Sequence, residues 1–191
     1  ELAIRDPLTK LYNRRKFEEL LEYEIYRSAR YGHRFCLVTI DLDDFKQVND
    51  TYGHPTGDIV LREIASLLNN SVRKSDMVAR VGGDEFSIIL SETDLKGGIA
   101  VAEKLRQTVE KTPFSIMIGH IGVKASFGLA EYPTNGEAMK ILITASDVAL
   151  YRAKRHGKNQ VIAIDALDSD VKEIKMEIVK SGEKLQAAID E

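Results

Sequence analysis

Three features are scarce in this sequence: cysteine, long apolar runs and excess basic charge. The single cysteine, Cys36, excludes a disulfide within the chain, and its place in an apolar run predicts a buried strand position, which suits a reducing compartment. No apolar run approaches the roughly 20 residues of a membrane span, and no signal-peptide pattern is present. The net charge of −3 lacks the basic excess of proteins that bind polyanions. We therefore expect a cytoplasmic segment without membrane contact and without a nucleic-acid polymer as partner.

The length of 191 residues suits one domain with a substantial core, which we place at residues 1–164, followed by a tail at residues 165–191. The tail is expected to be an amphipathic helix or a linker. Its apolar and small residues are spaced three and four apart, like a short coiled-coil seam, which favours packing on its own domain or a dimer mate over a link to a further domain. Because the chain starts at Glu1, we expect a longer protein whose missing part could hold a sensor or an anchor. The seam residues are Val171, Ile174, Ile178, Ser181, Leu185 and Ala188.

Hydrophobic periodicity predicts helices and strands along the whole domain. The apolar run at residues 35–40 is long enough for a central strand buried on both faces, and it ends at Asp41. Asp43 is expected to cap a short helix, and residues 119–122 to form a turn between two strands. The fold class is therefore α/β (α+β), with a mixed, partly antiparallel central sheet flanked by helices. Helices are expected at residues 13–31, 44–50, 58–72, 95–112 and 137–155, and strands at 35–40, 77–90 (a hairpin), 114–118, 123–130 and 161–164.

The stretch at residues 80–86 places two acids directly after a double glycine, between two apolar runs. This pattern is typical of a β-hairpin with a tight turn, in which Gly82 and Gly83 tolerate a positive φ. Asp84 and Glu85 would then be fixed by the strands but open to solvent, which suits metal ligands or catalytic acids. The local pattern fits an ordinary polar hairpin tip equally well.

A third acid, Asp41, ends the predicted buried strand, where a carboxylate is costly unless a cation or hydrogen bonds compensate it. The hairpin with Asp84 and Glu85 could neighbour this strand end. Carboxylates from two adjacent strand ends suit Mg²⁺, which takes one or two protein carboxylates and leaves its other positions to water and substrate phosphates. A nucleoside triphosphate is the expected ligand, although chance placement of these acids also fits the pattern.

The stretch Gly82-Gly83-Asp84-Glu85-Phe86 spells the name motif of the GGDEF family of diguanylate cyclases, which the sequence resembles over about residues 5–164. Further blocks of that family occur in the same order and spacing, and only the tail lies outside the resemblance. These blocks are Asp6-Pro7-Leu8-Thr9 with Leu11, Asn13, Arg14 and Arg15; Asp41-Leu42-Asp43-Asp44-Phe45-Lys46 with Asn49-Asp50 and Gly53-His54; Gly57-Asp58; Ser126-Phe127-Gly128; and Ala149-Leu150-Tyr151-Arg152-Ala153-Lys154.

The resemblance implies a palm-like fold related to class III nucleotide cyclases and polymerases, and a homodimer that joins two GTP molecules into cyclic di-GMP with release of two pyrophosphates. It implies Mg²⁺, or Mn²⁺ in its place, held by Asp41, the backbone carbonyl of Leu42, Asp84 and Glu85. Asp84 also matches the proton acceptor, and Glu85 supports a metal or the attacking 3′-hydroxyl. Lys46 fits a stabiliser of the charge that develops on the phosphates, or else a solvated helix lysine.

Substrate contacts follow from the same resemblance. Asn49 and Asp58 match the residues that recognise guanine, because an amide and a carboxylate can pair with its O6 and N1/N2 edge; Asp58 could equally cap the helix at 58–72. His54 matches a substrate contact, although a lone loop histidine is more often structural. Lys154 and Lys158 match phosphate contacts, although the helix dipole also favours cations near a helix C-terminus. The expected substrate contacts are Phe45, Asn49, His54, Asp58, Lys154 and Lys158.

Arg73 and Asp76 match the RxxD inhibitory site of the family, where dimers of the product bind. The bidentate geometry of arginine suits phosphate and guanine edges, while a surface ion pair is the plain alternative. In relatives an arginine on the following helix completes the site, and Lys104 stands at that place here. Because lysine cannot form the same fork, we expect inhibition to be weaker or differently arranged.

The sequence therefore predicts an active, metal-dependent diguanylate cyclase domain with product feedback inhibition. Two alternatives stay open. One is a non-catalytic module that binds or senses GTP or cyclic di-GMP, which degenerate hairpin acids would favour. The other is a cyclase with a different nucleotide product, which Asn49 and Asp58 disfavour.

Overall fold

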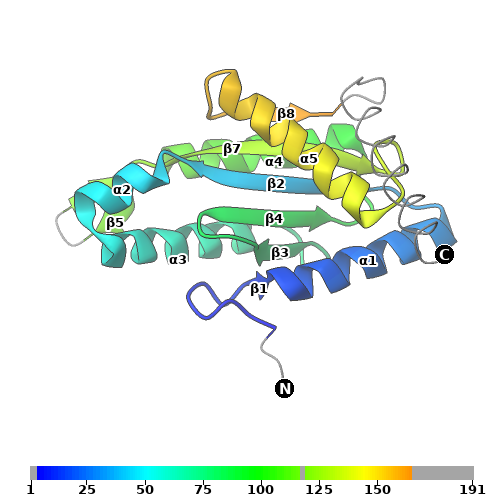
Figure 1. Cartoon of the computed structure of the whole chain (residues 1–191), viewed down its shortest axis with the longest axis horizontal. Helices are drawn as coiled ribbons and strands as arrows, with labels where there is room; N and C mark the ends of the chain where they lie inside the picture. The colour runs from blue at the N-terminus through cyan, green and yellow to red at the C-terminus, as the bar shows by residue number, and fades with distance from the viewer. Residues whose placement is uncertain (1–3, 117–118, 165–191) are drawn as a thin grey trace, which may run out of the picture.

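The structure, a computed structural model, describes residues 4–116 and 119–164 of the chain. At its centre a six-stranded sheet has inner strands that run antiparallel to one another and two edge strands that pair in parallel with their neighbours (Figure 1). This arrangement confirms the predicted mixed, partly antiparallel sheet. In spatial order the strands are β1 (Tyr12–Asn13), β3 (Met77–Arg80), β4 (Glu85–Leu90), β2 (Phe35–Asp43), β7 (Lys124–Tyr132) and β8 (Val161–Ala163).

Four long helices cover the two faces of the sheet. Helices α1 (Arg14–Tyr31) and α5 (Met139–Arg155) pack on one face, and α3 (His54–Ser71) and α4 (Leu95–Lys111) pack on the other. In Figure 1, α5 crosses in front of the sheet and α4 lies behind it. A short helix, α2 (Phe45–Tyr52), follows β2. None of the helices in the described ranges is long and apolar enough to cross a bilayer.

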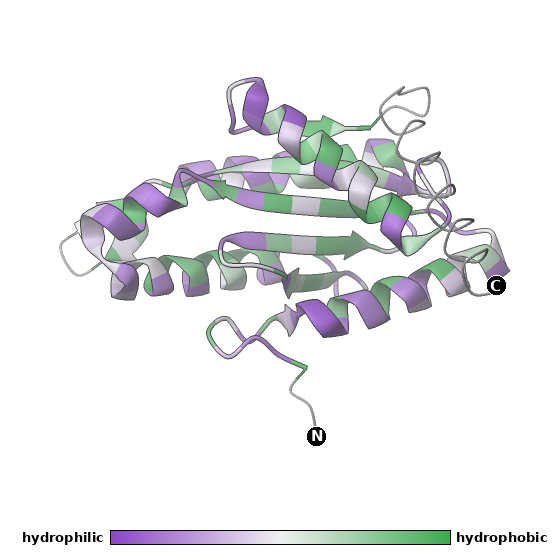
Figure 2. Ribbon diagram, viewed as in Figure 1, coloured by the Kyte–Doolittle hydropathy of each residue, from purple (hydrophilic) through white to green (hydrophobic). Residues whose placement is uncertain are grey.

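Strand β2 is apolar on both faces over most of its length. Cys36, Val38 and Ile40 belong to the core cluster beneath α3 and α4, whereas Phe35 and Leu37 belong to the cluster beneath α1 and α5. Successive side chains of a strand point to opposite faces, so a strand between two helix layers needs apolar residues throughout. In Figure 2 much of the central strands is green, whereas the helices alternate between purple and green bands. The continuous apolar run therefore predicted this strand correctly.

Beyond the predicted strand end, β2 continues as far as Asp43, so that Asp41 and Asp43 both lie in a paired strand. The predicted helix cap at Asp43 is wrong, because α2 begins only after Asp44, which has φ 56° and makes no side-chain cap bond. Asp43 instead accepts hydrogen bonds from Ser126 Oγ at 2.7 Å and from the Asn159 backbone N at 2.9 Å. These long-range donors occupy the oxygens that a cap would have used.

The predicted turn at residues 119–122 is also wrong. Residues Gly119–Ile121 form strand β6, which pairs with β5 (Phe114–Ile116) in a separate two-stranded sheet. Strand β7 then starts at Lys124. Phe114 is fully buried and anchors this small sheet to the core. Glycines weaken the strand signal because they carry no side chain to show the alternation.

Helix α3 begins at His54, four residues before its predicted start. The reason is local: Gly53, with φ 82°, precedes the helix, and Pro55 lies in its first turn, where the missing N–H costs nothing. The predicted helices at 13–31, 95–112 and 137–155 agree with α1, α4 and α5 within two residues. The tail at residues 165–191 lies outside the described residues.

Candidate active site

The polar ends of β2 and β4 lie side by side. Asp41 is the register partner of Glu85, and the amide of Leu42 donates to the carbonyl of Asp84 at 3.3 Å. This confirms that the hairpin neighbours the strand that carries Asp41. Because side chains alternate along strands, Asp41 and Glu85 share the sheet face covered by α1 and α5, whereas Asp84 lines a cleft on the α2 and α3 side.

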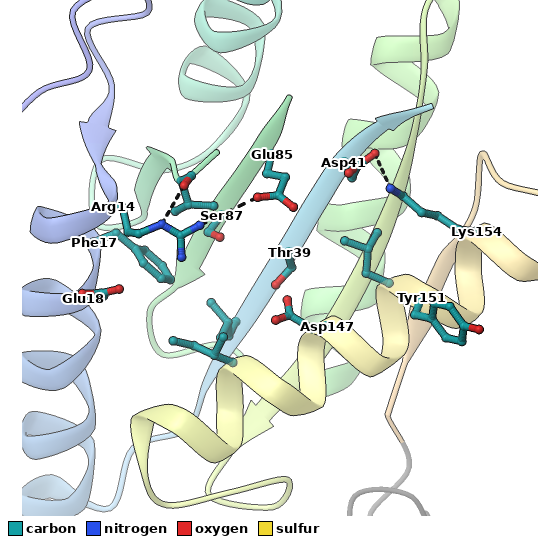
Figure 3. A pocket seen from close by; sticks show the side chains of 14 residues that line it. Arg14, Phe17, Glu18, Thr39, Asp41, Glu85, Ser87, Asp147, Tyr151 and Lys154 are labelled. Atoms are coloured by element: carbon teal, nitrogen blue, oxygen red, sulfur yellow. Dashed lines mark hydrogen bonds and ion pairs between the residues drawn. The ribbon is translucent and has the colours of Figure 1, made fainter. Parts of the chain in front are cut away.

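A cleft of about 330 Å³, here called the α1/α5 cleft, lies over β2 and β4 (Figure 3). Asp41, Glu85 and Lys154 line it, and Lys154 Nζ is 2.6 Å from Asp41 Oδ1. Burial raises the pKa of Asp41; Lys154 opposes this effect, while Asp84 and Glu85 add to it. A buried carboxylate beside two other acids requires a compensating cation, and in this structure Lys154 supplies one.

A second cleft, of about 450 Å³ and here called the α2/α3 cleft, opens on the other side of the same strand ends. Asn49 is accommodated there because the next helix has a glycine: a Cβ at Gly57 would collide with the Asn49 amide. The Gly57-Asp58 block of the sequence thus has a steric basis. Six residues predicted for catalysis or substrate binding line this cleft: Phe45, Lys46, Asn49, His54, Asp58 and Asp84.

The alternative role of Asp58 as a helix cap is wrong. Helix α3 begins at His54 after Gly53, which places Asp58 inside the helix. Its carboxylate is therefore not needed for the first turn of the helix. The partly buried side chain lines the α2/α3 cleft instead, together with Asn49.

The turn between β3 and β4 consists of residues 81–84. Neither of its glycines has the positive φ expected from the sequence. A Cβ at Gly82 would instead collide with the carboxylate of Glu85, which folds back over the turn, whereas Gly83 faces open space. The amides of Val81 and Gly82 donate to the carbonyl of Glu85 at 3.0 and 3.3 Å. Gly82 is therefore explained by the close approach of an acid, not by backbone strain.

Two arginines hold this turn from opposite sides. Arg14 Nε donates to the carbonyl of Val81 at 2.8 Å. Arg80 donates from Nε and from a terminal nitrogen to the carbonyl of Gly83 at 3.1 and 2.7 Å, and it pairs with Asp6 at 3.0 Å. The family resemblance included Asp6 and Arg14 but assigned them no role. Their contacts depend on the pairing of β1 with β3, which the sequence analysis did not predict.

The two predicted phosphate-binding lysines, and Lys46, the predicted stabiliser of transition-state charge, lie around the two strand ends. Lys154 contacts Asp41, and Lys158 Nζ is 2.6 Å from Asp44 Oδ1, a hydrogen bond that raises the pKa of Lys158. Lys46 is exposed on α2 and lines the α2/α3 cleft. An incoming anion could therefore compete with Asp41 for Lys154 and with Asp44 for Lys158. It could bind the exposed ammonium of Lys46 directly.

The donors at the strand ends suit a hard divalent cation. Within residues 4–116 and 119–164 no three side chains of His, Cys, Asp or Glu are grouped so that they could hold a metal ion. Mg²⁺ needs only one or two carboxylates when substrate phosphates complete its shell. Asp41 is 8% exposed, and the backbone of Leu42 continues the same strand end. A carboxylate as buried as that of Asp41 needs a positive charge beside it, and Mg²⁺ or Mn²⁺ would supply one.

Comparison with known proteins agrees with this geometry. Residues 3–160 match the family described as "Diguanylate cyclase, GGDEF domain". The chain belongs to this family. It is 41% identical over 157 residues to the diguanylate cyclase DosC of Escherichia coli K12, which covers 82% of this chain and 34% of DosC. It is 39% identical over 159 residues to the diguanylate cyclase DgcP of Pseudomonas aeruginosa, covering 83% of this chain and 24% of DgcP. The GGDEF chain thus spans about a quarter to a third of the length of these curated relatives.

Solved GGDEF structures have the same fold. The diguanylate cyclase SiaD of P. aeruginosa, crystallised with its activator SiaC, matches with a TM-score of 0.81 and 40% identity, covering 85% of this chain and 62% of SiaD. The coiled coil and GGDEF domain of DgcB from Caulobacter crescentus, crystallised with c-di-GMP, matches with a TM-score of 0.79 and 31% identity, covering 85% of this chain and 86% of that chain. The fold predicted from the GGDEF resemblance is therefore confirmed.

The predicted inhibitory residues of this GGDEF domain lie outside both clefts described above. Arg73 is exposed and lines two further clefts, of about 570 and 400 Å³. The Arg73 backbone N donates to the carboxylate of Asp76 at 2.9 Å. Burial raises the pKa of Asp76, and the hydrogen bond from Arg73 opposes that rise. Asp76 therefore holds the backbone of the loop that carries Arg73.

Lys104, the third predicted inhibitory residue, is exposed on α4 and does not line the clefts that Arg73 lines. Two other arginines line them: Arg27 of α1 in the smaller cleft, and Arg34 in the larger one. Neither arginine could be linked to Arg73 from the sequence, because both are distant from it in the chain and belong to none of the GGDEF motifs.

Proposed function

We propose that this domain condenses two GTP molecules into cyclic di-GMP with release of two pyrophosphates. One observation carries the proposal: the six predicted residues of the α2/α3 cleft converge beside the strand ends that carry Asp41 and Glu85. A cleft of about 450 Å³ that contains an amide and a carboxylate then adjoins a cluster of acids. Such a neighbourhood suits a purine nucleoside triphosphate whose phosphates reach a metal.

For guanine recognition, Asn49 and Asp58 provide the selective groups. The Asn49 amide can donate to O6, and the Asp58 carboxylate can accept from N1–H and the N2 amino group of guanine. Adenine has the wrong donors and acceptors at this edge, so it would leave Asp58 facing an acceptor. A buried polar group left without its partner costs about 1–3 kcal/mol, which is enough for useful selection.

Asp41, the Leu42 carbonyl, Asp84 and Glu85 would hold Mg²⁺ or Mn²⁺, which supplies charge neutralisation of the triphosphate and activation of the 3′-hydroxyl. Asp84 accepts the proton of that hydroxyl. Lys46 stabilises the charge that grows on the phosphate oxygens. With the charge of Asp41 balanced by the divalent cation, Lys154 would be free to leave Asp41 and bind the phosphates of the nucleotide, and Lys158 would do the same from Asp44.

A homodimer is part of the proposal because each domain binds one GTP and the product joins two. Each 3′-hydroxyl must attack the α-phosphate bound by the other subunit, so the two α2/α3 clefts have to face one another. Product inhibition is the second regulatory element: cyclic di-GMP would bind at Arg73, with Arg27 and Arg34 as the additional cations of the two flanking clefts.

The decisive experiment incubates the purified chain with Mg²⁺ and GTP, ATP or both, and identifies the products by chromatography. We expect cyclic di-GMP from GTP, none from ATP, and no turnover without the metal. Binding of GTP with no product at high protein concentration would favour the non-catalytic binding module. A mixed or adenine-only product would contradict the guanine assignment.

A further inference from the structure

We propose that Arg14 is a positioning residue, which holds the GGDEF turn and the carboxylate of Glu85 from the start of helix α1. The inference rests on the proposed cyclase function, because it concerns the second acid of that site. Arg14 belongs to the first GGDEF sequence block, yet the proposed mechanism assigns it no role. Its two contacts join helix α1 to both the backbone and the acid of the turn.

The guanidinium of Arg14 makes these contacts with two of its nitrogens. Its Nε donates to the Val81 carbonyl at 2.8 Å, and one terminal nitrogen lies 3.9 Å from Glu85 Oε2. The carboxylate of Glu85 lies against Gly82, where a Cβ would collide with it unless the glutamate changed rotamer. Figure 3 shows Arg14 and Glu85 on neighbouring elements at the edge of the α1/α5 cleft. The carboxylate of Glu85 thus lies between the turn backbone on one side and the guanidinium of Arg14 on the other.

The backbone of Arg14 is itself fixed by the sheet. Strand β1 pairs in parallel with β3, and Asn13 is the register partner of Arg80. Asn13 also caps α1 by accepting from the Lys16 amide at 3.0 Å. Arg14 and Val81 follow directly after a paired residue on each strand, so their separation is set by the ladder. A long, planar side chain at this position can then bridge from the helix to the turn.

Stability does not explain this arrangement. The side chains of Arg14 and Glu85 are 61% and 46% exposed, and an ion pair that is exposed to this degree contributes little to folding. Its effect is on geometry, because a free glutamate of that exposure would sample several rotamers. Groups that orient a metal ligand or a reacting group from behind usually change activity about 10- to 100-fold when they are removed.

Arg80 differs from Arg14 in what it holds. It donates to the Gly83 carbonyl and pairs with Asp6, and so it restrains the backbone on the Asp84 side of the turn. Arg14 restrains the Val81 side and is the arginine of the two that is paired with Glu85. Changes at Arg14 should therefore act on Glu85 while leaving the nucleotide contacts of the α2/α3 cleft in place.

The test uses the full chain with Arg14→Ala and Arg14→Lys, and Lys16→Ala as the matched control. Lys16 lies on the same turn of α1 and pairs with Glu19 at 3.0 Å, away from the GGDEF turn. Lysine at position 14 keeps a charge and the helix, but its single ammonium cannot donate to the Val81 carbonyl and pair with Glu85 from two separate nitrogens as the guanidinium does. Steady-state rates, the Mg²⁺ concentration for half-maximal rate, and amide hydrogen exchange over residues 81–86 are measured for each protein.

We expect both Arg14 variants to lose about 10- to 100-fold in kcat and to need more Mg²⁺, with KM for GTP within about threefold of the wild type. Exchange at residues 81–86 should accelerate in both variants and not in Lys16→Ala. Added guanidinium ion should restore part of the activity of Arg14→Ala. If Arg14→Ala does not fold, Arg14→Lys provides the same comparison.

Wild-type kcat in folded Arg14→Lys, a rise in KM without loss of kcat, or unchanged exchange over residues 81–86 would each overturn the inference. A loss that Lys16→Ala reproduces would overturn it as well, since the effect would then belong to the helix. Failure of the wild type to convert GTP is a different result. It would contradict the proposed function, while the exchange measurement would still test whether Arg14 holds the turn.

Discussion

Asp41 and Glu85 lie directly opposite one another on β2 and β4, and each is paired with a cation from a different helix. Two like charges at opposed positions of an antiparallel pair repel each other. Lys154 of α5 offsets the first and Arg14 of α1 the second, at 2.6 and 3.9 Å. The strand ends thus keep two carboxylates close together on one face, each offset by a basic side chain.

Asp84→Asn is expected to abolish cyclic di-GMP formation while leaving the fold intact. An amide keeps the size of the side chain but cannot accept the 3′-hydroxyl proton and binds Mg²⁺ poorly. Product formation and circular dichroism are measured on the same preparation. Retained turnover would contradict the assignment of Asp84.

Asp58→Ser is expected to weaken selection of GTP over ATP by about 10- to 100-fold, the effect of losing a hydrogen bond of about 1–3 kcal/mol. Because Asp58 lies inside α3 and does not cap it, the melting temperature should change little. The ratio of kcat/KM for the two nucleotides provides the measurement. Asn49→Ala serves as the partner variant, with a higher KM for GTP expected; unchanged values in both would refute the guanine contacts.

Arg73→Ala is expected to raise the inhibition constant of cyclic di-GMP by about 10- to 100-fold, because a charged hydrogen-bond donor is removed from the phosphates. Arg27→Ala should have a smaller effect in the same direction, since Arg27 lines only one of the two Arg73 clefts. Lys104→Ala is the control and should leave inhibition unchanged, because Lys104 lines neither of the Arg73 clefts. Initial rates are measured over a range of added product; inhibition that is equal in Arg73→Ala and wild type would exclude this site.

The stability of the domain is expected to depend on pH through Asp6. Burial opposes ionisation of Asp6, but hydrogen bonds from Thr9 and the contact with Arg80 outweigh it, so the pKa of Asp6 in the folded state is lowered. A lowered folded-state pKa stabilises the protein above the unfolded-state pKa, and this contribution is lost as the pH falls through the folded-state value. Urea unfolding should show wild type more stable than Asp6→Asn near neutral pH, with the difference shrinking below about pH 4. A difference independent of pH would contradict the ion pair.

Cys36 is expected to resist alkylation in the native protein. It is fully buried, and burial raises the pKa of its thiol to about 12, so the reactive thiolate is almost absent at neutral pH. Mass spectrometry after iodoacetamide treatment should detect modification only in denaturant. Rapid labelling of the folded chain would indicate opening of the α4 side of the sheet.

Where the sequence carried a strong local signal, the prediction was correct. Strand β2 is apolar throughout because both of its faces are buried, and the helices show apolar residues at a spacing of three and four because one face of each is buried. The predicted start of α3 was wrong because the backbone geometry at Gly53 sets it, and hydrophobic periodicity does not reveal that geometry. The predicted role of Asp43 was wrong because its partner, Ser126, is distant in the chain.

By itself the sequence, through its GGDEF motifs, determined which family the chain belongs to and predicted Asn49, Asp58 and Asp84 as site residues, which line one cleft in the structure. Only the tertiary structure decided how the site residues are divided between two clefts and which groups hold them. That division depends on the register of β4 against β2, which puts Glu85 beside Asp41 on one face and Asp84 on the other. The hold of Arg14 on the turn depends likewise on β1 pairing with β3, because pairing between strands far apart in the chain sets distances that local sequence does not encode.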